Sequence, residues 1–329
     1  MKWIKITTTI LLSLVVILTI FYVSFTPTKN PSFGITYSPT YAAYLGLDPI
    51  KGYEEILSTL HPKHVRLTAY FETVEPAEGK FDFSQIDALL TLSEKYNTDV
   101  LLVLGHKQPR WPECHHPDWY PALPATEQRQ AILDLITAQV NHFKSFPVIS
   151  RWQVENEALF DFGLNCKPLT KKELAEEIKL VKQLDTRPVV LTDSGEKGGW
   201  FTAAKLSDVF GPTMYRTVYN PKYGGYMSYR LPPAFYRVRA GMLVLFTKTN
   251  KFIGAELQGE PWFAHDIHET PVADQLALMS AKQLQENAEY ARKVGFAENY
   301  FFGAEWWLWL KHSKNDNSLV EAAYKILNP

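Results

Sequence analysis

Two acidic segments, each placed where a strand is expected to end, could supply a pair of reactive carboxyl groups. The first is 153–157 (QVENE) and the second is 255–258 (AELQ), about a hundred residues farther along the chain. Hydrolysis of a glycosidic bond needs two carboxyl groups, one that protonates the leaving oxygen and one that attacks or stabilises the sugar carbon. The sequence therefore predicts Glu157 as the acid/base and Glu256 as the nucleophile, if the fold brings them together.

Each of these two carboxyl groups needs its own surroundings. The proton donor must hold its proton near neutral pH, so burial or the negative charge of Glu256 should raise the pKa of Glu157. Glu256 must stay ionised, and hydrogen bonds from Arg66 and the Tyr215 hydroxyl would favour its charged form. Arg66 could instead be a buried ion-pair partner, and Tyr215 a core residue. Asn156 could donate its amide to a sugar hydroxyl beside the reacting carbon.

Two further glutamates compete for the catalytic roles. Glu155 could be the acid, but side chains alternate along a strand, which places Glu155 on the face opposite Asn156. Glu260 could be the nucleophile, but it lies beyond the expected end of its strand, where a loop or subsite role is favoured. We therefore retain Glu157 and Glu256 as the predicted pair.

Aromatic rings and histidines near the expected strand ends are candidates for sugar binding. Aromatic residues make up 14% of the chain, and ring faces are common in the lining of ligand sites. His106 follows an expected strand, Trp111 lies in the loop after it, and Trp306 begins the segment WWLW. We expect all three to contact substrate, with loop or core packing as the alternative for each.

Two histidine groups raise the alternative of a metal site. They are the adjacent pair His115 and His116, and the pair His265 and His268. Zinc sites take three or four ligands of defined geometry, and no H-E-x-x-H segment is present. We therefore expect these histidines to be solvated or to line subsites, and we expect neither a metal nor another cofactor.

Apolar and amphipathic segments alternate along the chain from Phe33 onward. Strands are expected at Gly34–Tyr37, His64–Thr68, Val100–Leu104, Ser150–Val154, Val189–Thr192, Gly211–Tyr215, Phe252–Ala255 and Tyr300–Ala304. Helices are expected between them at Ile50–Leu60, Ser84–Tyr96, Thr126–Phe143, Thr170–Leu184, Thr202–Asp208, Leu231–Thr247 and Val272–Lys293, with Leu319–Leu327 last. This alternation predicts an α/β fold, a single-domain (β/α)8 TIM barrel over 33–329. The rival is a doubly wound open sheet, but no G-x-G-x-x-G follows the first strand.

In such barrels the chemistry takes place at the C-terminal ends of the strands. The polar residues at those positions are Arg66, His106, Asn156, Glu157, Asp193, Tyr215, Glu256 and Glu305. The predicted catalytic pair is therefore part of a larger ring of polar residues at one rim.

The first 25 residues differ from the rest. Lys2 and Lys5 precede an uncharged stretch of twenty residues, 6–25, which as a helix would span about 30 Å, enough for the hydrocarbon core of a membrane. We expect an uncleaved signal-anchor or transmembrane helix at 1–25, a short linker at 26–32 and a barrel on the extracytoplasmic side. The alternative is secretion after cleavage of a signal peptide, although no clear small-x-small site is present.

The net charge limits the kinds of binding partner, and the two cysteines could form a disulfide. A formal net charge of −1 gives no footprint for nucleic acid, so we expect a carbohydrate substrate and the membrane as partners. Cys114 and Cys166 lie in neighbouring loops of the exported part, where a disulfide can form, but two separate thiols remain an alternative. The sequence leaves the oligomeric state open.

Four segments resemble the retaining glycoside hydrolases of clan A, especially the β-galactosidase families 35 and 42 and family 5-like enzymes. They are 153–157 (QVENE), 66–83 (RLTAYFETVEPAEGKFDF), 255–258 (AELQ) and 303–307 (GAEWW). The resemblance implies a (β/α)8 barrel, retention of configuration, and the same acid/base and nucleophile as above. It also implies that Trp306 forms the floor of a sugar subsite. The chain departs from the family pattern in having Asn-Glu-Ala in place of Asn-Glu-Pro and no room for the usual extra domains.

These observations predict a membrane-anchored glycosidase that cleaves a β-glycosidic bond in an oligo- or polysaccharide. Two alternatives remain, a barrel that binds glycans at the cell surface without turnover and a metal-dependent barrel hydrolase. The sugar, the linkage and the endo or exo mode depend on loop shapes that the sequence does not specify.

Overall fold

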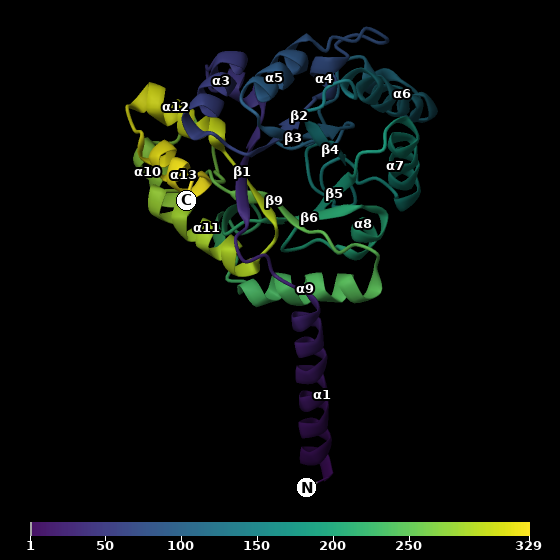
Figure 1. The fold of residues 1–329 in the computed structure, drawn as a ribbon, viewed down its shortest axis with the longest axis vertical. Coiled ribbons are helices and arrows are strands. Elements are labelled where there is room, and N and C mark those ends of the chain that lie inside the picture. The colour runs from purple at the N-terminus through teal and green to yellow at the C-terminus, as the bar shows by residue number, and fades with distance from the viewer. Residues whose placement is uncertain (1) are drawn as a thin grey trace.

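Eight parallel strands close into a barrel in the computed structural model, which describes residues 2–329 and the side chains from residue 6 onward. The strand order around the barrel is β1-β10-β9-β6-β5-β4-β3-β2, and helices surround it (Figure 1). The strands are β1 Ser32–Tyr37, β2 His64–Thr68, β3 Asp99–Leu104, β4 Ile149–Val154, β5 Val189–Asp193, β6 Val209–Met214, β9 Ile253–Gln258 and β10 Glu298–Phe302. The predicted (β/α)8 fold is confirmed, and the open-sheet alternative is wrong.

The helices follow the strands much as the sequence patterns predict. They are α2 Pro39–Tyr44, α3 Pro49–Leu60, α4 Phe71–Val74, α5 Ser84–Lys95, α6 Ala125–Phe143, α7 Lys171–Leu184, α8 Phe201–Leu206, α9 Pro233–Phe246, α10 Val272–Leu278, α11 Ala281–Val294, α12 Ala304–Lys314 and α13 Ser318–Leu327, with a 3-10 turn at Tyr120–Ala122. Thr170 and Glu173 form the capping box expected at the start of α7.

Two local predictions differ from the structure, and one hairpin was not predicted. The single helix predicted over Val272–Lys293 is wrong, because Met279 is extended and Ser280 starts α11 with its own capping box to Gln283. The strand predicted over Tyr300–Ala304 ends earlier, at Phe302, because Gly303 has a φ of 124° and Ala304 begins α12. A hairpin of β7 Thr217–Asn220 and β8 Gly225–Ser228 follows β6, and its strands had not been predicted.

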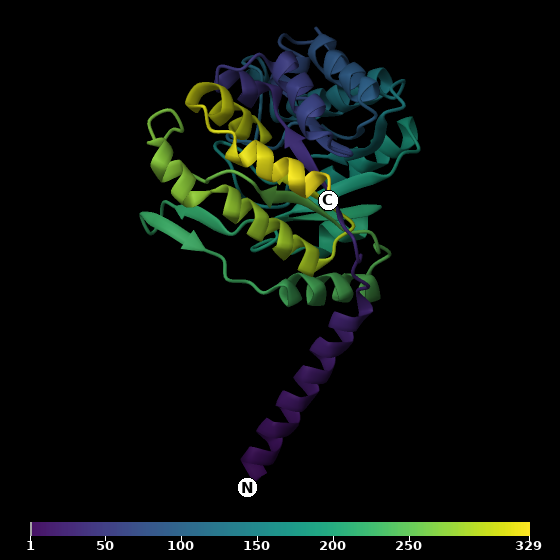
Figure 2. The ribbon, with the colours of Figure 1, turned by 60° about the vertical axis from the view of Figure 1, so that its left-hand side comes forward.

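The N-terminal helix α1, Lys2–Ser24, projects away from the barrel (Figures 1 and 2). Within the described residues, Ile6–Ser24 of α1 is the one stretch long and apolar enough to cross a membrane, a property that signal sequences share. Met1, part of the predicted segment 1–25, lies outside the described residues. The segment predicted as a linker lies against the barrel, where the Thr28 N–H donates to Gly295 O at 2.8 Å and Ser32 already belongs to β1.

A disulfide joins Cys114 in the loop after β3 to Cys166 in the loop after β4. The two Cα atoms lie 5.3 Å apart, so neighbouring loops of the C-terminal rim do meet, as the sequence allowed. The Leu164 N–H also donates to Pro112 O at 3.1 Å, which adds a backbone contact between the same loops. The bridge therefore holds together two loops that border the predicted site.

Candidate active site

Glu256 lies within β9, and each of its carboxylate oxygens accepts a hydrogen bond. The Arg66 guanidinium donates from Nη1 to Oε1 at 2.7 Å, and the Tyr215 hydroxyl donates to Oε2 at 2.8 Å. Arg66 comes from β2, on the far side of the barrel interior, and is fully buried. Hydrogen bonds on both oxygens fix the orientation of the carboxyl group.

The same arginine also organises the segment that precedes Glu157. Arg66 donates from Nε to Gln153 Oε1 and from Nη2 to Asn156 Oδ1, both at 2.8 Å. The Thr192 hydroxyl donates to the same Asn156 oxygen at 3.1 Å. The amide of Asn156 is therefore oriented with its oxygen toward Arg66 and its nitrogen on the other side.

Glu157 lies just beyond the end of β4, in a stretch where the backbone leaves the extended conformation. Both Glu155 and Glu157 have positive φ, 59° and 44°. The Glu157 N–H donates to the Thr192 hydroxyl at 2.8 Å, and the Thr213 hydroxyl donates to Glu157 Oε1 at 3.3 Å. Burial, followed by the negative charges of Glu256 and Glu113, raises the pKa of Glu157 well above its ordinary value. The raised pKa favours the protonated form of the Glu157 carboxyl group.

Thr213 lies beside both Glu256 and Glu157. It is the register partner of Glu256 across the β6–β9 pair, and its hydroxyl contacts Glu157. Both glutamates are nearly covered, with 8% of Glu157 and 5% of Glu256 exposed. Two acids that are distant in the sequence are therefore neighbours at one rim of the barrel.

Glu155 lies just beyond β4 with a φ of 59°, so strand alternation does not decide its direction: Gln153, two residues earlier, bonds Arg66 together with Asn156, whereas the Glu155 carboxylate turns to the loop after β3. Its carboxylate accepts the backbone N–H of His106 at 3.1 Å and also that of Lys107. A Cβ at Gly105 would overlap this carboxylate, so the glycine is required for the close approach. The Glu155 carboxylate therefore supports the loop after β3, while its backbone carbonyl oxygen accepts from Gln153 Nε2 at 2.9 Å.

A third carboxyl group, which the sequence analysis did not assign, lies beside the pair. Glu113 is buried in the disulfide-bridged loop, where its Oε2 accepts from Asn156 Nδ2 at 3.3 Å and lies 3.8 Å from Lys107 Nζ. Burial is the main cause that raises the pKa of Glu113 to about 8, and the charge of Glu256 adds to it. The sequence offered one indication, a glutamate between Trp111 and Cys114 in the loop already expected to border the site.

His106 belongs to a group of polar side chains beneath the same loop. Its Nδ1 lies 2.7 Å from His116 Nε2, and burial lowers the pKa of His106 to about 3, so its ring is neutral at neutral pH. The Sγ atom of Cys114 lies close enough to both rings to suggest three metal ligands. Cys114 is bonded to Cys166, however, and a disulfide sulfur is not the thiolate that binds zinc. These residues therefore do not fit a zinc site.

Aromatic rings form a continuous series from the solvent to Tyr215. Trp111, which is 62% exposed, meets Phe162 edge-on at 5.9 Å, and Phe162 lies 5.7 Å from Trp262. Trp262 in turn meets Tyr215 edge-on at 5.2 Å, all between ring centroids. Phe162 and Trp262 had not been singled out as sugar-binding candidates. The series provides apolar ring surface next to Glu256.

Trp306 has a different position from the one expected for the floor of a subsite. It lies in α12, is fully buried, and donates from its indole N–H to Gln275 Oε1 of α10 at 2.8 Å. It is part of the main hydrophobic core. The early end of β10 explains this placement, because the helix carries the ring into the core.

Glu260 and Glu305 form a second charged cluster around Arg110. The Arg110 guanidinium pairs with Glu260 through Nη1 and with Glu305 Oε2 through Nη2, the latter at 2.8 Å. It also stacks on the rings of Tyr41 at 3.6 Å and Phe302 at 4.2 Å. Burial raises the pKa of Glu260 to about 7 despite the opposing charge of Arg110.

Asp193 and the second pair of histidines lie outside the cluster around Glu256. Asp193 ends β5 and accepts the backbone N–H groups of Ser194 at 2.9 Å and Trp200 at 2.7 Å, so it shapes the following loop. His268 is exposed and lies 3.1 Å from the Tyr44 carbonyl oxygen. None of these hydrogen bonds involves Glu157 or Glu256, although the charge of Asp193 adds to the causes that raise the pKa of Glu157.

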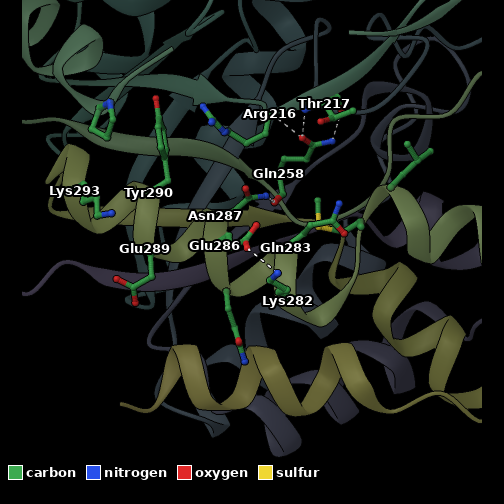
Figure 3. Close-up of a pocket in the computed structure, with 14 residues that line it drawn as sticks. Arg216, Thr217, Gln258, Lys282, Gln283, Glu286, Asn287, Glu289, Tyr290 and Lys293 are labelled. Atoms are coloured by element: carbon green, nitrogen blue, oxygen red, sulfur yellow. Dashed lines mark hydrogen bonds and ion pairs between the residues drawn. The ribbon is translucent and has the colours of Figure 1, made fainter. Parts of the chain in front are cut away.

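The cleft drawn in Figure 3, with a volume of about 700 Å³, lies apart from the two carboxyl groups. Arg216, Gln258 and Tyr290 are part of its lining, which includes none of the predicted site residues. Gln258 accepts the N–H groups of Arg216 and Thr217 at 2.8 and 2.9 Å, as the dashed lines show. These bonds tie the end of β9 to the start of the hairpin and thereby help to place the neighbouring Tyr215.

No protein-family model and no curated protein matches the chain. Several solved structures do share its fold. GH5_18 from Bifidobacterium longum subsp. longum has a TM-score of 0.59 at 12% identity, covering 83% of this chain and 69% of its own. A glycosylated GH10 endo-β-1,4-xylanase from Gloeophyllum trabeum has a TM-score of 0.58 at 14% identity, covering 91% and 96%. TsXylA, an intracellular xylanase from Thermoanaerobacterium saccharolyticum, has a TM-score of 0.54 at 20% identity, covering 86% and 88%.

These neighbours confirm, at the level of the fold, the resemblance to clan A that the sequence motifs indicated. At such low identity the shared property is the barrel itself, and the roles of individual residues must be argued from this chain's own geometry.

Proposed function

We propose that the protein is a retaining glycoside hydrolase that cleaves a β-glycosidic bond, with Glu157 as acid/base and Glu256 as nucleophile. One observation carries the proposal. Glu256 is held by a cation and a phenol, while Glu157, its neighbour across Thr213, contacts a neutral hydroxyl and has a raised pKa. Two adjacent carboxyl groups in different surroundings, one beside a cation and one with a raised pKa, are what nucleophile and acid require.

The first chemical step follows from this arrangement. Glu157 gives its proton to the glycosidic oxygen as that bond breaks, and a Glu256 oxygen forms a bond to the anomeric carbon. The Arg66 and Tyr215 hydrogen bonds orient Glu256 for this attack. In the second step Glu157, now ionised, takes a proton from water, and the water oxygen displaces Glu256 from the sugar.

The residues around the pair suggest how substrate is held. Asn156 Nδ2 and the Glu113 carboxyl present polar atoms beside the pair, suited to a sugar hydroxyl near the reacting carbon. Trp111, Phe162 and Trp262 offer ring surface that leads outward from Tyr215, suited to further sugar units. His106 contributes to substrate binding indirectly, through its contact with His116 in the loop after β3. Trp306 keeps only an indirect role, because its ring has no exposed surface.

A substrate screen on the full-length protein tests the proposal. The panel should include aryl β-glycosides, xylans and β-mannosides, since the fold neighbours include xylanases and a GH5_18 structure in complex with Manβ1-4GlcNAc. Wild type should release sugar from at least one substrate. The Glu256→Gln variant should release no sugar. The Glu260→Gln variant, changed at the neighbouring cluster, should still release sugar. Binding without turnover across the whole panel would instead support the glycan-binding alternative.

Retention is tested separately by following the anomeric configuration of the first product by NMR. A β product formed from a β substrate supports the covalent route through Glu256. An α product would show inversion, with Glu256 activating a water molecule. A chelator should leave the enzyme activity unchanged. If the chelator abolished the activity and added metal restored it, the metal-dependent alternative would be supported.

We further propose that α1 is retained as a membrane anchor and that the barrel lies on the extracytoplasmic side. The length and apolar composition of Ile6–Ser24, and the lysines at positions 2 and 5, support this topology. The disulfide suits an oxidising compartment. The mature N-terminus, read by mass spectrometry of the membrane fraction, should begin at or next to Met1.

A further inference from the structure

The C-terminal end of α1 and the residues after it are packed specifically against the barrel. Phe25 is buried, and its ring meets Phe252 and Phe296 edge-on at 5.6 and 5.7 Å. These two residues lie just before β9 and β10, at the N-terminal rim of the barrel. The segment after α1 is therefore a docked part of the fold, and α1 has a defined position relative to the barrel.

Helix α9 lies across the end of α1 and contacts it closely (Figures 1 and 2). A Cβ at Gly241 would overlap the Phe21 carbonyl oxygen, so a glycine is needed where the helices meet. Phe21 and Phe246 meet edge-on at 6.1 Å, and the Arg237 guanidinium pairs with the Tyr22 hydroxyl. Three positions along α9, Arg237, Gly241 and Phe246, therefore hold the last turn of α1.

This contact sets the depth of α9 relative to a membrane. Phe21 lies inside the candidate span Ile6–Ser24, three residues from its end. At about 1.5 Å per residue the contact lies roughly 5 Å below the end of the span, and a helix with its side chains is about 10 Å across. If α1 crosses the bilayer, α9 must therefore lie at the boundary between headgroups and acyl chains.

The outer face of α9 has the composition that this depth requires. Val238, Met242 and Leu245 follow one another at helical spacing, and Leu245 and Phe246 are 48% and 57% exposed. Lys248 and Lys251, just beyond the end of the helix, are exposed as well. Apolar side chains beside basic ones are typical of helices that lie in a membrane interface.

We propose that α9 is a second membrane-contacting element, lying in the interface of the bilayer that α1 spans and holding the barrel against it. The proposal rests on the retained anchor proposed above and is independent of the glycosidase activity. Because α1 docks beside the N-terminal rim, the C-terminal rim with Glu157 and Glu256 stays open to solvent.

Site-specific fluorescence quenching in vesicles tests this arrangement. Both native cysteines are bonded to each other, so a single added cysteine can be labelled without reduction. Full-length Val15→Cys, Leu245→Cys, Phe246→Cys and Glu94→Cys are labelled with an environment-sensitive dye. The vesicles contain phosphatidylcholine and phosphatidylglycerol, with spin-labelled lipids that quench either near the headgroups or deep in the acyl region. Glu94 serves as the exposed control on α5, which lies away from α1 in both ribbon views.

The shallow quencher should quench the labels at 245 and 246. The extent should be within about twofold of the quenching that the deep quencher causes for the label at 15. The label at 94 should be unaffected by either lipid. Quenching at 15 without quenching at 245 and 246 would show a barrel that stands clear of the bilayer, and would overturn the proposal. Absence of quenching at 15 would overturn the anchor itself and this inference with it.

All four substituted side chains are exposed, so their replacement should leave the fold intact. Release of sugar by the labelled proteins is scored separately and reports only on the glycosidase proposal.

Discussion

Two arginine–glutamate clusters lie at the same rim of the barrel, and they differ in how their carboxyl groups are paired. Arg110 binds Glu260 and Glu305 together, so both acids of that cluster share one cation. Arg66 binds one acid, Glu256, and uses its other nitrogens on the amides of Gln153 and Asn156. The second acid beside the Arg66 cluster, Glu157, contacts the hydroxyl of Thr213.

This difference in pairing is the basis on which we propose that one rim contains both structural acids and acids that react. A buried acid that shares a cation is a structural ion pair, and breaking the pair mainly costs stability. An acid that is buried next to another negative charge keeps its proton, and it can deliver that proton when a leaving group arrives. The two clusters therefore give opposite expectations for enzyme activity when a glutamate in each is replaced by glutamine.

The largest effect is expected for Glu256→Gln. Replacement of the nucleophile should lower kcat by more than about 10⁴-fold, because no covalent intermediate can form. The circular dichroism spectrum should stay close to that of wild type, and the free energy of unfolding should fall by about 1–3 kcal/mol, because the charge-assisted hydrogen bond to buried Arg66 is weakened. Steady-state kinetics on the best substrate from the screen measures the effect. A variant that keeps full activity would end the assignment of Glu256.

Glu157→Gln should lower kcat by about 10²–10⁴-fold on substrates with poor leaving groups, because the proton donor is lost. The loss in the first step should shrink on dinitrophenyl glycosides, whose leaving group departs without protonation. A pre-steady-state burst of dinitrophenol measures this step. An equal loss on both kinds of substrate would contradict a role as proton donor.

Glu113→Gln tests the third carboxyl group through its pH dependence. Above pH about 8 Glu113 is ionised, and its charge then helps to hold the proton on Glu157. Removing that charge should move the alkaline limb of kcat/KM to lower pH, which a pH–rate profile measures. A limb that does not move would exclude coupling between these two groups.

The same variant should change how stability depends on pH. The folded-state pKa of Glu113 lies above its ordinary value of 4.5, so the stability that it contributes is present below pH 4.5 and is lost as pH rises toward about 8. In wild type this group alone lowers the free energy of unfolding by up to about 1.4 kcal/mol for each pH unit in that interval. Urea unfolding at pH 5 and pH 8 should therefore show a smaller decrease for Glu113→Gln. A decrease equal to that of wild type would contradict the raised pKa.

The smallest effect on activity is expected at the other cluster. Glu260→Gln should leave kcat within about tenfold of wild type, because Glu260 transfers no proton in the proposed steps. It should lower the free energy of unfolding by about 1–3 kcal/mol, because a charge-assisted hydrogen bond to Arg110 is weakened. Kinetics and urea unfolding on one preparation measure both quantities. A loss of activity comparable to that of Glu256→Gln would shift the nucleophile to Glu260.

The fold was largely predictable because the hydrophobic pattern of each strand and helix depends only on residues close together in the sequence. Each strand has a run of apolar residues and each helix an apolar face, so periodicity locates both without knowledge of their partners. The errors occurred where single residues override the pattern, as at Gly303, which ends β10, and Ser280, which divides the helix predicted from Val272 onward. The position of Trp306 in the core follows from the first of these.

The candidate site was predictable in part, for a related reason. Glu157 and Glu256 could be selected because barrels place strand-end residues at one rim. Glu113, Phe162 and Trp262 were missed as site residues because they lie on loops, whose paths depend on contacts between distant segments. The disulfide and the backbone bond from Leu164 to Pro112 bring those loops together, and alternation along a strand gives no indication of either.

The sequence by itself determined the alternation of strands and helices, the apolar N-terminal helix and the two acids at strand ends, because each depends on residue type and near-neighbour spacing. Only the tertiary structure decided that Arg110 pairs with Glu260 and Glu305, which glutamate lies in the loop beside the pair, and that α9 rests against the last turn of α1. Pairing and burial arise when distant segments meet, and those meetings also set the electrostatic environment of every carboxyl group at the rim.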